Sequence, residues 1–316
     1  MDHVSTIEAT QAIVTLDVPL PGIIWGWMIT LNMWAKSIGT GVILVGAYLL
    51  YRHKKEDMPN LRWLMPLISF VALNVFLLFT LLDLHQPLRM VNIFLHPHWT
   101  SAITVGAWMA SLFTLLITIM ALIGFFDEFK DVRKHCVLAK SVRAISGFYE
   151  GIFPFVVLLA FPVTMYTAII MAEASARELW AAPAEIIQML LAAFMVGSAS
   201  LILISGKWSD GARRDLAWIL GLSVLFSFLM YMGEYFFSFK ASEVEATLEY
   251  VHSGGAYYTQ FWTAMVLGYI IPFFISMSSV KNYSRVLMKF AALTTLIGLY
   301  LAKSTWLEIP QMLSLS

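Results

Sequence analysis

The sequence predicts an all-α integral membrane protein with eight transmembrane helices. Of its 316 residues, 59% are hydrophobic and only 13% are charged, a composition typical of polytopic membrane proteins. Most of its apolar stretches reach the roughly 20 residues that a helix needs to cross a bilayer. The eight stretches lie near residues 22–50, 61–82, 100–125, 148–171, 181–205, 216–238, 258–279 and 286–302. Eight helices of this kind can form two four-helix bundles.

The lysine and arginine residues alternate in number from one connection to the next. Fifteen of the twenty fall in four connections: 51–62, 126–147, 206–215 and 280–289. The segments between them carry one each: Arg89, Arg177, Lys240, and Lys303 in the tail. Positively charged loops remain in the cytoplasm. We therefore predict an even number of crossings, with the N and C termini extracytoplasmic.

These boundaries divide the chain into three parts. Residues 1–21 form an extracytoplasmic segment, 22–303 the eight-helix membrane domain, and 304–316 an extracytoplasmic tail. The first twenty residues lack the basic region of a signal peptide, so we expect them to be retained. The formal net charge is zero, which argues against a nucleic-acid partner.

Individual helices carry further signals. Stretch 22–50 is long enough to tilt or to extend beyond the hydrocarbon. Stretch 148–171 contains Pro154 and Pro162, each of which bends a helix by removing a backbone hydrogen bond. Small residues recur in 22–50 and 181–205, where they allow close helix packing. Tryptophans that suit the outer interface mark several helix ends: Trp25, Trp27, Trp34, Trp99 and Trp180.

Cysteine and histidine usage restricts the cofactors. The single cysteine, Cys136, lies in a connection, which argues against an iron–sulfur cluster in this chain. All seven histidines fall in termini, connections or helix ends, so facing histidines that would hold a haem within the bilayer are lacking. If the protein transfers electrons, its metal centres belong to a partner.

One cation lies within an apolar stretch. Asn32, Lys36 and Thr40 are spaced by four residues and share one helix face. A lysine at the centre of a membrane helix costs about 2.5–3.5 kcal/mol on insertion scales. Lys36 is therefore expected to face a partner or a wet cavity, and the alternative role is a structural ion pair.

Other polar residues cluster at the predicted outer half of the membrane, at the ends of several helices. They include Asp83, Tyr166, Thr167, Glu185, Gln188, Tyr231 and Glu234. On the inner side, Glu150 is the acid that we expect to be partly embedded. Hydrogen-bonding groups, protonatable groups and aromatic walls together suit the head group of a lipid-soluble quinone.

Three segments resemble the polysulfide reductase membrane-subunit (NrfD-like) family. They are WGWMITLNMWAKSIGTGVIL, LLDLHQPLRMVNIFLHPHWTSAITVGAW and FPVTMYTAIIMAEASARELWAAPAEIIQMLLAAFMVGSASL. The resemblance implies Asp83, Pro87 and Arg89 in an outer hairpin and Tyr166 in the helix bundle. Two positions depart from the family's commonest form: Ala168 replaces a glycine, and the glycine frequent before Arg-Pro is replaced within His85-Gln86-Pro87.

The resemblance also implies partners and a location. Members are quinone-interacting anchors of complex iron–sulfur–molybdoenzymes in the bacterial or archaeal cytoplasmic membrane. The implied partners are an extracytoplasmic ferredoxin-like iron–sulfur subunit and a molybdopterin or multihaem cytochrome catalytic subunit.

The combined interpretation is a quinone-reactive subunit of a respiratory oxidoreductase, using menaquinone or ubiquinone, with proton translocation left open. Asp83, Glu234 and Lys36 are candidates for proton exchange. The candidates for binding the quinone are Asn32, Lys36, Asp83, Tyr166, Gln188 and Glu185. The alternatives are a secondary transporter that uses Lys36 and Glu234 as coupling residues, and a structural anchor without a quinone site.

Overall fold

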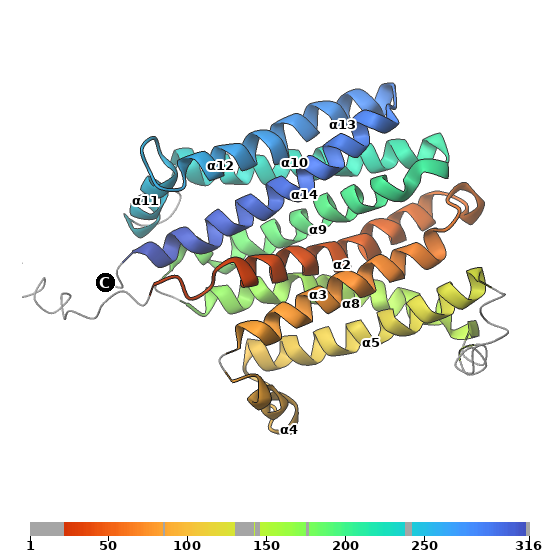
Figure 1. Cartoon of the computed structure of the whole chain (residues 1–316), viewed down its shortest axis with the longest axis horizontal. Coiled ribbons are helices and arrows are strands. Elements are labelled where there is room, and N and C mark those ends of the chain that lie inside the picture. The colour runs from red at the N-terminus through yellow and green to blue at the C-terminus, as the bar shows by residue number, and fades with distance from the viewer. Residues whose placement is uncertain are drawn as a thin grey trace, which may run out of the picture.

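Eight long apolar helices run side by side in a computed structural model of the chain (Figure 1). The structure describes residues 22–84, 86–129, 142, 146–174, 177–237 and 242–313. The N-terminal segment 1–21, His85, Cys136, Lys240 and the five cations of connection 126–147 lie outside this part. Within it, all regular structure is helical, which confirms the predicted all-α membrane fold.

The spans match the predicted stretches in order. They are α2 (Trp27–Arg52), α3 (Leu61–Asp83), α5 (Ala102–Glu128), α8 (Tyr149–Ala172), α9 (Ala182–Ile204), α10 (Asp210–Phe237), a seventh made of α12 (Tyr258–Ala264), η7 (Met265–Ile270) and α13 (Ile271–Lys281), and α14 (Arg285–Glu308). Three ends differ from the prediction. α2 begins at Trp27, five residues later than expected. α10 begins at Asp210, before the apolar run, and α14 continues through Lys303 to Glu308, because buried neighbours surround this part of the helix.

The helices form two four-helix bundles that share a seam. α2, α3, α5 and α8 pack as one ring, and α9, α10, the seventh span and α14 pack as the other. α2 and α9 join the bundles, and their backbones touch: a Cβ added to Gly41 would lie 1.9 Å from the Ala193 carbonyl oxygen. The small residues noted in the sequence therefore permit this contact.

The seventh span contains a π-helical turn, Met265–Ile270, immediately before Pro272. Proline cannot donate a backbone hydrogen bond and crowds the preceding turn, and a π turn relieves this conflict. The turn lies against α14, where a Cβ on Gly298 would be 2.1 Å from Gly268 Cα. This contact brings Tyr269 into the interior, where its side chain is completely buried.

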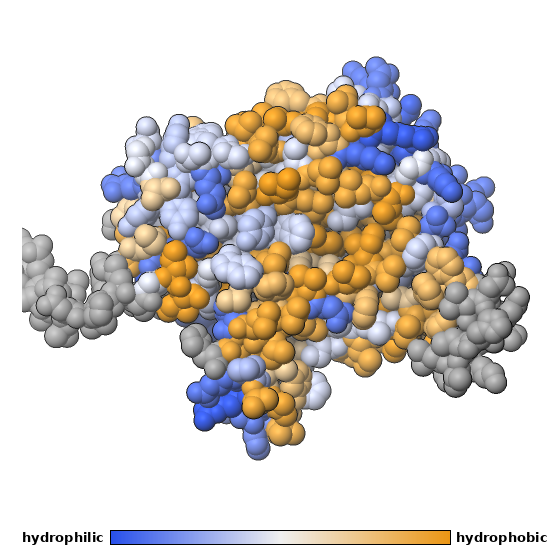
Figure 2. Space-filling view, in the orientation of Figure 1, coloured by the Kyte–Doolittle hydropathy of each residue, from blue (hydrophilic) through white to orange (hydrophobic). Residues whose placement is uncertain are grey.

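Both ends of the described chain lie together. Gln311 accepts a hydrogen bond from the backbone of Ile24 at 3.0 Å, and its side-chain amide donates to the Trp25 carbonyl at 2.9 Å. We call this the terminal end of the molecule, and the opposite one, with the loops after α2, α9 and α13, the basic end. Apolar side chains gather between the two ends on the face in Figure 2, as expected for a chain that crosses a membrane.

The connection between α3 and α5 contains two short helices, η2 (Pro87–Val91) and α4 (Asn92–Leu95). They project from the terminal end of the first bundle (Figure 1). Leu88 and Leu95 are largely exposed on them.

Candidate functional site

Lys36 lies inside the protein, on α2, with no exposed surface. Its ammonium group donates a hydrogen bond to the Thr167 hydroxyl on α8. The same nitrogen lies 4.5 Å from the centre of the Tyr166 ring, a cation–π distance. These partners are neutral groups, so the described contacts of Lys36 differ from the structural ion pair considered as an alternative.

Asn32 lies one turn from Lys36 toward the terminal end and contacts α3 instead of α8. Its amide donates to the Phe76 carbonyl at 3.2 Å and to the Thr80 hydroxyl. Thr80 in turn donates to the same carbonyl at 2.8 Å. Two residues on one face of α2 thus contact two different helices. Asn32 contacts Thr80 on α3, and Lys36 contacts Tyr166 on α8.

Thr80 and Tyr166 line one cavity in the first bundle. It has a volume of about 490 Å³ and lies between α3, α4, α5 and α8 near the terminal end. Its walls are mainly apolar and include Phe76, Leu81, Phe94 and Ile170. Leu78 and Ile103 also line it and are about half exposed, so the cavity opens toward the lipid-facing side of the bundle.

A glycine determines how the Tyr166 ring lies. Gly106 on α5 faces the ring, and a Cβ at this position would lie 2.3 Å from Tyr166 Cδ2. Ordinary van der Waals contact begins near 3.4 Å. The ring therefore packs directly on the α5 backbone and is held between Gly106 and Lys36.

Asp83 lies at the edge of this region. It is the last residue of α3, one turn beyond Thr80, and its side chain is half-buried. Arg89 is exposed on η2. Both residues therefore lie in the hairpin at the terminal end of the bundle, the position that the resemblance implied.

The predicted residues Glu185 and Gln188 belong to a second polar cluster, in the second bundle. Both are buried on α9. Glu185 accepts a hydrogen bond from the Trp306 indole of α14 at 3.0 Å. Ser227 of α10 donates to the Gln188 side-chain oxygen at 2.7 Å, and Gln188 donates back to the Ser227 carbonyl at 3.3 Å.

The second cluster contains a buried lysine that the sequence analysis assigned to the tail. Lys303 on α14 is only 5% exposed, and its ammonium group lies 3.1 Å from the Met189 sulfur. It is close enough to Glu185 and to Lys36 for the charges to interact. Lys303 is therefore the member of the second cluster that interacts with Lys36 of the first bundle.

Aromatic rings complete the second cluster. The Tyr231 ring lies 4.8 Å from Trp306 and 5.8 Å from Tyr269, edge to face in both cases. Glu234 is buried on α10 one turn beyond Tyr231, toward the terminal end. Tyr231 and Glu234 were expected near one another, whereas Tyr269 and Trp306 were not predicted.

The structure thus divides the expected site residues between the two bundles. Tyr166 lines the cavity of the first bundle, with Lys36 against its ring and Asn32 bonded to Thr80. Glu185, Gln188 and Glu234 belong to the second bundle. Helical periodicity places residues on a face, but it does not determine which helix that face meets. For Lys303, the apolar residues before it and Trp306 and Leu307 about one turn later were the available signal.

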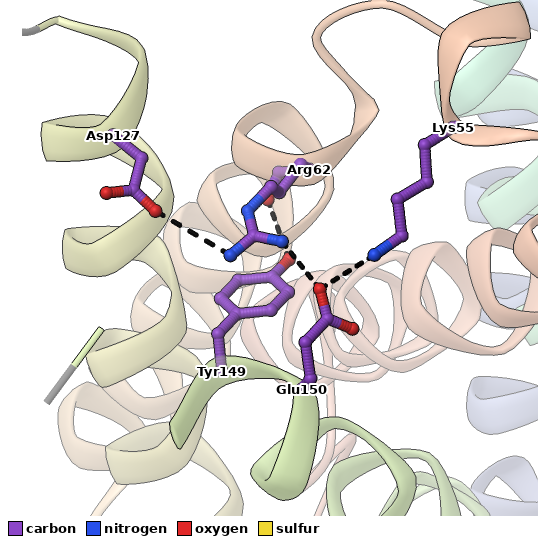
Figure 3. A network of polar contacts seen from close by, with 5 residues as sticks. All are labelled: Lys55, Arg62, Asp127, Tyr149 and Glu150. Carbon is purple, nitrogen blue, oxygen red and sulfur yellow. Dashed lines mark hydrogen bonds and ion pairs between the residues drawn. The ribbon is translucent and has the colours of Figure 1, made fainter. Parts of the chain in front are cut away.

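Glu150 also differs from expectation. Its side chain is 55% exposed at the basic end and accepts hydrogen bonds from Lys55 at 2.8 Å and Arg62 at 2.6 Å (Figure 3). It was expected to be partly embedded, whereas the structure places it in a surface ion-pair network with Lys55 and Arg62.

Comparison with known proteins identifies a family for the chain. None of the curated proteins matches the chain significantly. The model of one protein family, described as polysulphide reductase, NrfD, matches residues 19–313, which include all eight spans and both polar clusters.

Proposed function

Because the chain belongs to the polysulphide reductase NrfD family, we propose that it is the quinone-reactive membrane subunit of a respiratory oxidoreductase complex. Members of this family are membrane subunits associated with redox complexes. One observation carries the proposal of a quinone site. A lipid-accessible apolar cavity ends on a tyrosine that packs against a buried lysine.

The cavity suits a quinone in size and chemistry. Pockets for small organic ligands range over roughly 300–1,000 Å³ and combine apolar walls with a few placed polar groups. Here the walls would hold the ring and the first part of the isoprenoid tail. The Tyr166 phenol can donate a hydrogen bond to one carbonyl oxygen. The Thr80 hydroxyl can donate to the other if it turns away from the Phe76 carbonyl that it contacts here. Asn32 and Lys36 hold these side chains from behind. Menaquinone and ubiquinone both fit this description.

A bound quinone supplies two-electron chemistry that also takes up or releases two protons. In our proposal Lys36 holds the charge beside Tyr166, and Asp83 exchanges protons with water at the terminal end. Glu185, Gln188 and Glu234 do not touch the head group. Together with Lys303 they form a polar region next to Lys36, and a proton route across the second bundle would run through them.

The position of the cavity suggests where partners bind. It lies at the terminal end, beneath α4, so an electron donor or acceptor would dock there. If the basic end is cytoplasmic, that surface is extracytoplasmic and suits a ferredoxin-like iron–sulfur subunit with a molybdopterin or multihaem cytochrome catalytic subunit. Reporter fusions test the sidedness: we expect a cytoplasmic signal after Lys54 and an external signal after Leu95, and the opposite pair would reverse the assignment.

The quinone site is tested in the purified complex. Tyr166→Phe removes one hydrogen-bonding hydroxyl, and Lys36→Met keeps the side-chain length but removes the charge. Each should lower quinone-linked turnover roughly 100-fold, a typical contribution of a positioned acid–base group. Electron transfer from the partner subunits to soluble dyes should remain, because it does not use this cavity.

Tyr258→Phe is the matched control, since Tyr258 is exposed at the start of α12. It should leave quinone turnover unchanged. Normal turnover in both Tyr166→Phe and Lys36→Met would refute the site and favour a purely structural anchor. The transporter alternative would be favoured if these variants lost uptake of a solute while quinone turnover was unaffected.

A further inference from the structure

A second cavity lies at the basic end of the first bundle, away from Lys36 and Tyr166. It has a volume of about 400 Å³ between the end of α2, the loop to α3 and the start of α8. Lys55, Arg62 and Glu150 line its mouth, and Ala47, Leu50 and Phe153 line its wall. We propose that this cavity binds an anionic phospholipid, with the lipid phosphate between Lys55 and Arg62.

The cationic groups at the mouth have unused hydrogen-bonding capacity. Lys55 and Arg62 both donate to a single oxygen of Glu150, Oε1 (Figure 3). An ammonium group has three donors and a guanidinium has five. A phosphate diester, with two unesterified oxygens, can therefore bind to both side chains without displacing Glu150.

Arg62 is fixed in place for this role. Its guanidinium carbon lies 4.3 Å from the centre of the Tyr149 ring, and its second amino group lies 3.6 Å from an Asp127 oxygen. The Tyr149 hydroxyl donates to the Arg62 carbonyl at 2.7 Å. Contacts on several sides orient the guanidinium before a ligand arrives, which lowers the entropic cost of binding.

The charge of the cavity favours an anion. Of its lining residues, Lys55 and Arg62 are positive and Glu150 is negative, which leaves one net positive charge. Asp127 pairs with Arg62 but does not line the cavity. The lining itself therefore favours a phospholipid with one negative charge over a zwitterionic lipid, while Asp127 balances Arg62 from outside the cavity.

The apolar wall identifies the ligand as a lipid instead of a free anion. Ala47 precedes Arg52 by five residues, so it lies about 8 Å deeper along the helix at 1.5 Å per residue. Leu50 lies between these levels on the same helix, and Phe153 of α8 lines the same wall. A phosphate at Lys55 and Arg62 would therefore place the glycerol and first methylene groups against this wall. Basic pockets between membrane helices are known to take phospholipid head groups in this way.

Native mass spectrometry of the purified protein, titrated with defined lipids, tests the proposal. The wild type should retain phosphatidylglycerol more strongly than phosphatidylcholine of the same chain length. Lys55→Gln and Arg62→Gln should each weaken phosphatidylglycerol retention roughly fivefold, as expected for one basic side chain near an anionic lipid. Inorganic phosphate should not compete at millimolar concentration, because it lacks the acyl chains.

Two further variants keep the test decisive. Lys54→Gln removes an adjacent cation that does not line the cavity, and it should bind phosphatidylglycerol like the wild type. Ala47→Trp fills the wall without changing the charge and should weaken retention. Equal retention of the two lipids by the wild type, or an equal loss in Lys54→Gln and Lys55→Gln, would overturn the proposal. If phosphate displaced the lipid, the site would be one for a soluble anion. Quinone turnover does not enter any of these readouts.

Discussion

Gly106→Ala should disturb the Tyr166 ring more than its small size suggests. The new methyl group would lie 2.3 Å from Tyr166 Cδ2 and 2.6 Å from Cε2, about 1 Å closer than ordinary contact. The ring cannot simply retreat, because Lys36 lies on it. Overpacking of this kind costs typically about 1–3 kcal/mol, so we expect a loss of that size in the free energy of unfolding, measured by denaturant titration in detergent.

A second substitution separates this clash from other effects. Tyr166→Leu removes the ring carbons that the methyl group would strike, so Gly106→Ala should cost much less in that background. Neighbouring residues in such a cycle show coupling of about 0.5–3 kcal/mol. Gly151→Ala, on the same helix as Tyr166, is the control: its Cβ would meet no atom within 4 Å, so it should be neutral or stabilising. Additive costs for Gly106→Ala and Tyr166→Leu would refute the packing described for the ring.

Two more predictions concern the terminal half of the second bundle. Lys303→Met should destabilise the protein by roughly 3–5 kcal/mol, because it would leave Glu185 as an uncompensated buried charge. The double variant with Glu185→Gln should recover stability in the same denaturant titration. No recovery would argue against charge coupling between Lys303 and Glu185. The pKa of Tyr257 is raised to about 12 by burial and by its 2.8 Å hydrogen bond to Glu308. The stability supplied by the protonated phenol is complete below pH 10 and is lost as the pH rises through 12. Tyr257→Phe should therefore reduce the fall in melting temperature over that interval. An unchanged slope in this variant would contradict the prediction.

The eight spans could be predicted because hydropathy depends only on local sequence. Lys36 was visible for the same reason, as a lone charge within an apolar run. Its partner Thr167 was not, since that contact depends on how α2 and α8 are aligned along their axes. Lys303 was misplaced because apolarity falls before α14 ends, although tertiary burial continues the helix beyond that point.

The site residues illustrate the same limit. Glu185 and Asn32 were both expected at the outer depth, and the structure places both near the terminal end. Depth follows from position along a helix, whereas membership of a bundle follows from packing between helices. The shape of the cavity could not be predicted, because it depends on residues that hydropathy does not distinguish. Gly106 is the main example, since its role is seen only once Tyr166 is known to lie against it.

The seam between α2 and α9 restricts how this protein can move. At Gly41 and Gly197 the main chains meet without side chains between them, so the helices cannot slide without collision of their carbonyl groups. A carrier that alternates its access must tilt one half against the other about such a boundary. Here close backbone contact at that boundary opposes movement of one bundle relative to the other, so we expect the two bundles to behave as one rigid unit. If the chain turns over quinone as proposed, we expect its motion to involve parts away from this seam, such as side chains around the cavity and the projecting hairpin with α4.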